Sequence, residues 1–185
     1  MSVQLAKRLL TVNEYYKMAE HGILKREERL ELIQGEIILK PKATARHTSV
    51  VMRLHTFLNK IEGDKCIVSV HHPITSNEFS EPEPDLALLH FREDFYEEKH
   101  PEPKDILLVI EVADTSLGYD REVKKPLFAA VGIPELWIVN IEEAQVEVYK
   151  NPANGDYISR QNFRRGDTIF IESLDFVVKV DKVLG

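Results

Sequence analysis

The chain contains a single cysteine, Cys66, among its 185 residues. One cysteine excludes an intramolecular disulfide and favours a protein of the reducing cytoplasm. Positive charge is also scarce, since 24 Lys and Arg against 31 Asp and Glu give a formal net charge of −7. Non-specific coating of nucleic acid requires a basic surface. The composition therefore excludes that class, but it permits an enzyme that contacts a few phosphates locally.

Long hydrophobic runs are absent too. No segment approaches the roughly 20 apolar residues of a membrane span, and the apolar stretch in MSVQLAKRLL is too short for a secretory signal. Internal repeats, low-complexity tracts and Gly/Ser linkers are also missing, while 43% hydrophobic and 30% charged residues are an ordinary globular balance. We therefore expect one cytoplasmic domain that spans residues 1–185.

Periodicity predicts the main helices and strands. Helices are expected over residues 12–21, 47–61 and 119–131, the first from a capping box at Thr11 and Glu14. Residues 30–39 suggest a β-hairpin around Gln34-Gly35. Short apolar runs predict further strands at 66–74, 84–89, 106–113, 136–141, 145–150, 168–174 and 176–180. This order indicates an α/β or α+β fold with a mixed sheet between helices.

Two carboxylates interrupt the apolar strands. Glu111 lies inside LLVIEVA, and Asp85 follows Pro84 at the start of PDLALL. Neighbouring strands could bring both to one point, where burial would require a partner that favours their charge. A divalent cation such as Mg²⁺ or Mn²⁺ is one such partner. For these two residues alone, an ordinary ion pair or an exposed edge strand is the simpler explanation.

A lysine in the next helix changes this balance. The apolar side of the predicted helix YDREVKKPLFAAV contains Val123, Leu127 and Val131, with Ala130 at its edge. Lys124 and Asp120 fall on that side, whereas Lys125 points away. Lys124 alone could extend its ammonium to water along a packed stem. Asp85, Glu111 and Lys124 together are better explained as one site.

These residues belong to blocks that resemble the putative restriction endonuclease family of the PD-(D/E)XK nuclease superfamily. The blocks are EYYKMAEHGIL, ERLELIQGEIIL, the helix led by His47, EPDLALL, LLVIEVADTSLGYDREVKKPLFAAVGIPELWIVN and VEVYKNP. Their order covers most of the chain and is more specific than any one motif. Pro84-Asp85 matches the first motif element and Glu111 the second. The usual lysine two residues later is replaced by Ala113, and Lys124 stands where this family supplies it from the following helix.

The resemblance implies a restriction endonuclease-like fold and phosphodiester hydrolysis in DNA. Asp85 and Glu111, with the Val112 carbonyl, would hold Mg²⁺ or Mn²⁺, which polarises the scissile phosphate and acidifies a water molecule. Lys124 would orient that water or help to deprotonate it, and would offset charge on the phosphoryl oxygens. A homodimer is implied as well.

Four further residues are accessory candidates for the site: Glu31, Glu36, His47 and Asp120. Glu31 and Glu36 flank the hairpin turn, and Glu31 is the better of the two, although placement on a surface strand explains it more simply. A histidine in the apolar stripe of a helix, like His47, is more often a hydrogen-bonded core residue. The pair His71-His72 lacks zinc-ligand spacing.

Basic clusters occur at residues 160–165 and at Lys40, Lys42 and Arg46. They could contact phosphates, but solvated surface is the simpler interpretation. The only tryptophan, Trp137, lies in a predicted strand and suggests a role in the core or an interface. Two other functions stay open beside the DNA endonuclease: a catalytically silent interaction or dimerisation module with a nuclease fold, and a metal-dependent hydrolase of RNA or a nucleotide.

Overall fold

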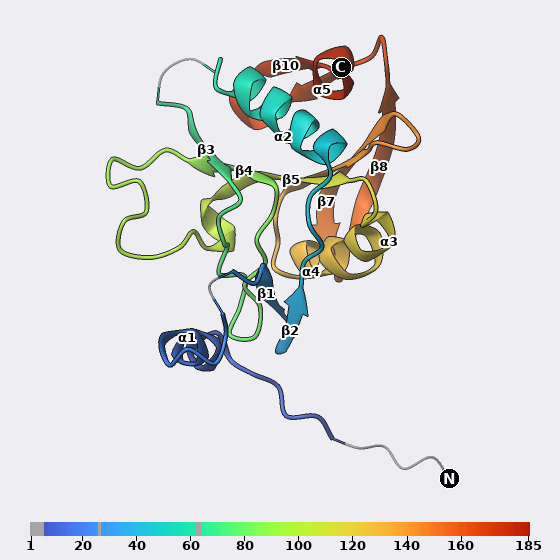
Figure 1. Cartoon of the computed structure of the whole chain (residues 1–185). Coiled ribbons are helices and arrows are strands. Elements are labelled where there is room, and N and C mark those ends of the chain that lie inside the picture. Colours follow the sequence, from blue (N-terminus) through green and yellow to red (C-terminus); the bar gives the residue numbers. More distant parts are fainter. Residues whose placement is uncertain (1–5, 26, 62–63) are drawn as a thin grey trace.

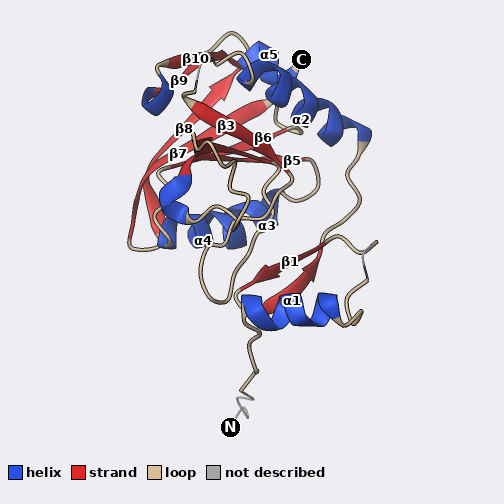
Figure 2. Ribbon diagram, turned by 90° about the vertical axis from the view of Figure 1, so that its left-hand side faces the viewer, coloured by secondary structure: helices blue, strands red, loops and turns tan. Residues whose placement is uncertain are grey.

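The computed structural model describes residues 6–25, 27–61 and 64–185. Its centre is a 6-stranded sheet in the order β3–β4–β5–β6–β7–β8. These strands span Cys66–Val70, Leu86–His90, Ile106–Ala113, Glu135–Asn140, Gln145–Ala153 and Asp156–Arg164. All neighbours are antiparallel except β5 and β6, which are parallel. Helices cover both faces (Figures 1 and 2), which confirms the expected mixed-sheet fold.

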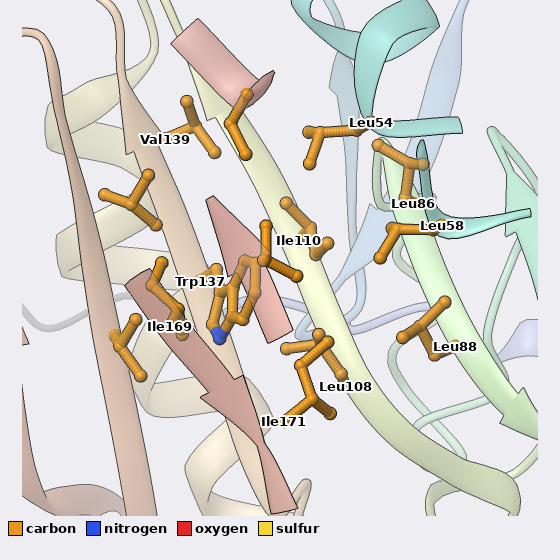
Figure 3. Close-up of a cluster of buried hydrophobic side chains, with 14 of the residues drawn as sticks. Leu54, Leu58, Leu86, Leu88, Leu108, Ile110, Trp137, Val139, Ile169 and Ile171 are labelled. Carbon is orange, nitrogen blue, oxygen red and sulfur yellow. The ribbon is translucent and has the colours of Figure 1, made fainter. Parts of the chain in front are cut away.

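The longest helix, α2 (Ala45–Leu58), covers one face together with α5 (Val180–Leu184) and the hairpin β9–β10 (Thr168–Ile171 and Phe176–Lys179). Its buried side chains are Val50, Val51, Leu54 and Leu58, as the periodicity predicts. They pack against Leu86, Ile110 and Trp137 of the sheet (Figure 3). Trp137 is fully buried, so its predicted core role is confirmed.

The other face is covered by the connection between β5 and β6. Parallel neighbours require a crossover, usually helical, rather than a tight turn. Here the crossover consists of α3 (Leu117–Tyr119), a π-helical turn η2 (Asp120–Lys124) and α4 (Lys125–Ala130). Phe128 of α4 packs against Val109, Ala113 and Ile138 of the sheet.

The predicted packed side of this helix is confirmed in part. Asp120, Lys124 and Leu127 are buried, as predicted. Val123 and Val131 are only half-buried and Ala130 is exposed, whereas Phe128 is fully buried against the sheet. The packed side is therefore centred on Lys124, Leu127 and Phe128 rather than on the row of valines.

The N-terminal part adds α1 (Val12–Glu20) and the hairpin β1–β2 (Leu30–Ile33 and Glu36–Leu39). The capping box at Thr11 and Glu14 is present. Gln34 and Gly35 have φ values of 51° and 77°, which suits a two-residue hairpin turn. A side chain at Gly35 would also meet the Leu9 Cβ at 2.5 Å, so glycine is required there.

Two elements escaped prediction, β8 and α5. Most of β8 is exposed, and Ile158 is 77% exposed. The segment therefore lacks the apolar pattern of a half-buried strand, and pairing with β7 along its length holds it in the sheet. Two short 3₁₀ turns complete the structure, η1 (Pro103–Asp105) and η3 (Glu172–Leu174).

Among the described residues, no helix is both long and apolar enough to cross a membrane. Residues 1–5 of the segment considered as a secretory signal lie outside the described ranges. The single domain over residues 1–185 stays a prediction.

Two residues of α2 provide a matched test of the core. We expect Leu54→Ala to lower the free energy of unfolding by about 2–5 kcal/mol, because a fully buried side chain leaves a cavity. Met52→Ala, two residues away and 63% exposed, should change it by less than about 0.5 kcal/mol. Urea unfolding measures both, and equal losses would contradict this packing of α2.

Candidate active site

Asp85 and Glu111 face each other across two neighbouring strands. The antiparallel register pairs Leu86 of β4 with Ile110 of β5. One further step along this register places Asp85, just before β4, opposite Glu111. Directly opposed residues in such a pair have Cβ atoms about 4.5–5.5 Å apart. The two carboxylates lie 6% and 3% exposed, on the side of the sheet that α4 covers.

Asp85 is held by groups from three segments. The Val112 backbone N–H donates to its Oδ2 at 2.7 Å. His47 Nε2 lies 3.0 Å from the same oxygen, and His71 Nδ1 lies 3.6 Å from Oδ1. Burial by itself would raise the pKa of Asp85, but the hydrogen bonds from His47 and Val112 outweigh it and lower that pKa. Asp85 is therefore held ionised in a defined orientation.

Glu111 is paired with the lysine from the crossover. Lys124 Nζ donates to Glu111 Oε1 at 2.9 Å, and both side chains are less than 5% exposed. Burial raises the pKa of the Glu111 carboxyl despite the lysine beside it. Burial would lower the pKa of Lys124, but the negative charges of Glu111, Glu31 and Asp120 overcome this and raise it. Lys124 is consequently a protonated ammonium.

Glu31 joins the site from the hairpin. Its Oε2 lies 3.3 Å from Lys124 Nζ and accepts from the Glu83 N–H, and its Oε1 accepts from the Tyr119 hydroxyl at 3.2 Å. It is 2% exposed, so the expectation of a surface strand position is wrong. The reason is tertiary, because β1 bridges to the segment before β4 through Leu32 and Glu81. That bridge turns Glu31 toward the crossover.

The π-helical turn presents Asp120 as well as Lys124 to the site. Asp120 is 3% exposed and accepts a hydrogen bond from the Ser116 hydroxyl at 2.7 Å. Burial raises its pKa, and the charge of Lys124 opposes that effect.

The same turn is fixed from its other side by Arg121. Its guanidinium pairs with both carboxylate oxygens of Glu147, a fully buried residue of β7. Tyr149 also donates to Glu147, at 2.5 Å. This pair anchors the turn that carries Asp120 and Lys124.

One hollow of about 300 Å³ is bordered by Glu31, Asp85, Glu111, Asp120 and Lys124, together with Lys40, Thr44 and Ser116. Four carboxylates are buried around it: Glu31, Asp85, Glu111 and Asp120. Lys124 is the only Lys or Arg buried in the part of the chain that the structure describes. Buried carboxyl groups therefore outnumber buried basic groups here, which suits a bound cation.

Asp85 and Glu111 offer carboxylate oxygens, the type of ligand that Mg²⁺ takes from proteins. Within residues 6–25, 27–61 and 64–185, no three or more His, Cys, Asp or Glu side chains are arranged to hold a metal ion. Mg²⁺ retains several waters and is usually bound by one or two carboxylates plus substrate phosphates. Asp85 and Glu111 would supply these carboxylates. The Val112 carbonyl stays a predicted ligand.

The other candidates divide between the hollow and the surface. His47 borders the hollow. Glu36 is exposed and pairs with Lys7 at 2.7 Å, so it contributes nothing to this hollow.

Two residues near the site were not predicted, His71 and Tyr119. His71 directly follows β3, whose last residue pairs with Leu86, so the strand register could have placed it beside Asp85. No sequence pattern distinguishes Tyr119.

The chain is similar to known proteins in sequence and in fold. A family model described as "Uma2: Putative restriction endonuclease" matches residues 12–180. A search of curated proteins finds no match. Among solved structures, the chain resembles a crystal structure at 1.96 Å described as a putative nuclease belonging to DUF820 from Anabaena variabilis ATCC 29413. The TM-score is 0.71 at 16% identity, with 95% of this chain and 97% of that chain covered. At this identity, the likeness shows a shared fold.

Removal of the buried ammonium should destabilise the protein. We expect Lys124→Met to lower the free energy of unfolding by about 3–5 kcal/mol, because Glu111 and Glu31 lose their partner. Adding Glu111→Gln should recover part of this, with a coupling energy of about 0.5–3 kcal/mol in a double-mutant cycle. Lys125→Met is the control, since Lys125 pairs with the exposed Asp156. Strict additivity of the two changes would contradict the pair.

Glu147 gives a pH-dependent prediction. Burial favours its neutral form, but hydrogen bonds from Arg121 and Tyr149 outweigh burial and lower its pKa below the ordinary 4.5. A carboxyl group whose pKa is lower in the folded state stabilises the fold at pH values above its unfolded-state pKa. This stabilisation is lost as the pH falls through the folded-state pKa. Glu147→Gln should therefore cost about 1–3 kcal/mol at pH 7, and less as the pH falls below 4.5. Urea unfolding across pH, with exposed Glu122→Gln as control, tests this; a difference independent of pH would contradict it.

Proposed function

Because the chain belongs to the Uma2 family of putative restriction endonucleases, we propose that it is a nuclease that hydrolyses phosphodiester bonds of DNA with Mg²⁺ held by Asp85 and Glu111. One observation carries the proposal. The buried Lys124 ammonium lies 2.9 Å from Glu111, which stands opposite Asp85 across β4 and β5. Three groups of the required chemistry thus converge from two strands and a crossover helix.

Each residue would have a defined task. Mg²⁺, when bound, supplies Lewis acidity that polarises the phosphate and acidifies water. Lys124 would offset the charge that develops on the phosphoryl oxygens and orient the attacking water. Because its neighbours raise its pKa, it would act as a fixed cation rather than as a base. His47 would hold the Asp85 carboxylate in place, and Glu31 would hold the Lys124 ammonium.

Cleavage of supercoiled plasmid tests the proposal. The wild type should produce nicked and linear DNA with Mg²⁺ or Mn²⁺, and none with EDTA. Asp85→Asn should reduce the rate by about 10²–10³-fold, because the carboxylate is lost while the shape is kept. Glu36→Gln removes an exposed carboxylate of the N-terminal hairpin, outside the hollow, and should cleave as the wild type does. Equal rates for the wild type and Asp85→Asn would refute the assignment.

A catalytically silent module is the second candidate. It is favoured by the pairing of Lys124 with both Glu111 and Glu31, which compensates these carboxylates without a metal. Calorimetric titration with Mg²⁺ separates the two candidates. A nuclease should release binding heat that Glu111→Gln abolishes, whereas a silent module should release none.

A comparison of substrates separates a DNA nuclease from a hydrolase of RNA or of a nucleotide. Duplex DNA, single-stranded RNA and a small phosphodiester, assayed under one set of conditions, would show which is cleaved. The homodimer and the cytoplasmic location stay predictions. Sedimentation of the purified protein tests the first.

A further inference from the structure

The solvent side of α2 carries a regular row of polar side chains. Arg46, Arg53 and Lys60 recur every seven residues. This spacing brings Arg46 and Arg53 to one side of α2, two turns apart, and Lys60 follows in the turn after the helix. Ser49 and Thr56 lie between them. All except the half-buried Ser49 are exposed. We call Arg46, Ser49, Arg53, Thr56 and Lys60 the basic stripe.

The stripe lies in a segment without acidic residues. Residues 40–61 contain five Lys and Arg and no Asp or Glu, in a chain whose net charge is −7. Such a long acid-free segment concentrates the scarce positive charge on α2 and the residues directly before and after it.

Neighbouring elements extend this charge. Arg53 and Lys60 border a shallow hollow with Lys182 of α5, and Arg46 and Arg53 border a second hollow with Arg165. The acidic groups nearby include Glu142, at the edge of the second hollow, Asp114, 3.6 Å from Arg46, and Asp181, which precedes Lys182 in α5. The Arg53 guanidinium also donates to the Leu184 carbonyl at 3.1 Å. Positive charge is still in excess on this side of α2.

The stripe begins at the mouth of the candidate active site. Thr44, the N-cap of α2, and His47 of its first turn border the active-site hollow. Ala43 borders both that hollow and the one beside Lys182. In Figure 1, α2 extends from this end across the top of the sheet toward α5 and β10. A ligand in the site can therefore continue along the stripe.

We propose that the basic stripe binds the phosphate backbone of a DNA duplex beyond the phosphate in the active site. This inference rests on the proposed nuclease function and names where its substrate lies. A helix of 14 residues is about 21 Å long at about 1.5 Å per residue, which matches roughly six base pairs at about 3.4 Å each. Arginine, lysine and hydroxyl side chains are the usual partners of phosphate oxygens. An extended polyanion thus matches both the length and the chemistry of the stripe.

The test compares two triple variants of equal charge. The stripe variant is Arg46→Gln, Arg53→Gln and Lys60→Gln, and the control variant is Lys17→Gln, Lys25→Gln and Lys99→Gln, all exposed residues away from α2. Fluorescence anisotropy measures the affinity for a labelled 20-base-pair duplex as a function of salt, without divalent metal. The slope of log affinity against log salt is negative, and its magnitude should decrease by about 2–3 in the stripe variant, or by about 0.9 for each lost phosphate contact. The control variant should keep the wild-type slope.

Each outcome decides between the alternatives. Equal slopes in both variants, or no binding of duplex by the wild type, would overturn the stripe. Polyglutamate that competes as well as DNA per unit charge would indicate an acidic protein partner and would also overturn it. Thermal unfolding checks that both variants fold.

Binding is separable from cleavage. If the wild type cleaves DNA but the stripe variant keeps the wild-type salt slope, the proposal for the basic stripe is refuted and the nuclease proposal stands. If the stripe variant has a shallower salt slope but the wild type cleaves no DNA, the proposal for the basic stripe stands and the nuclease proposal is refuted.

Discussion

The ion pair between Lys124 and Glu111 is the contact on which the arrangement of this site depends. Removal of each ion from water costs several kcal/mol, which is recovered only with good geometry and full hydrogen bonding. Glu111 comes from β5, Lys124 from the π-helical turn, and Glu31 from the hairpin. A shift of the π-helical turn would leave both buried carboxylates without their ammonium, and a shift of β5 or of the hairpin would leave Lys124 with one partner instead of two. The network therefore fixes the hairpin and the crossover relative to the central sheet.

The topology of the sheet explains why the lysine comes from a helix. Position 113, where the motif lysine would stand, is filled by Ala113, which packs against Phe128 and Ile138 beneath α4. A long charged side chain would displace that packing. The parallel neighbours β5 and β6 require a crossover, and this crossover passes over Glu111. One turn of it, anchored by Arg121 on Glu147, supplies the ammonium instead.

Charge is divided sharply between the interior and the surface. Buried carboxylates surround the hollow, whereas α2 at its mouth carries two arginines and no acidic residue, with lysines in the segments before and after it. A net charge of −7 describes neither region, because it sums an acidic interior and periphery with one basic helix. An acidic chain can therefore combine a site for a cation with a surface for a polyanion. The two proposals concern adjacent regions of one molecule and make separate demands on it.

The sequence by itself determined the elements whose signals lie within one segment. The apolar face of α2, the Gln34-Gly35 hairpin and the position of Glu111 inside an apolar strand could all be recognised from the sequence. Asp85, Glu111 and Lys124 could be grouped because each places a charge where its own element should be apolar. Only the tertiary structure decided that Glu31 is buried, that His71 lies beside Asp85 and that Phe128 rather than Val123 packs against the sheet. Those facts depend on strand register and on contacts between distant segments, and local periodicity carries no record of either.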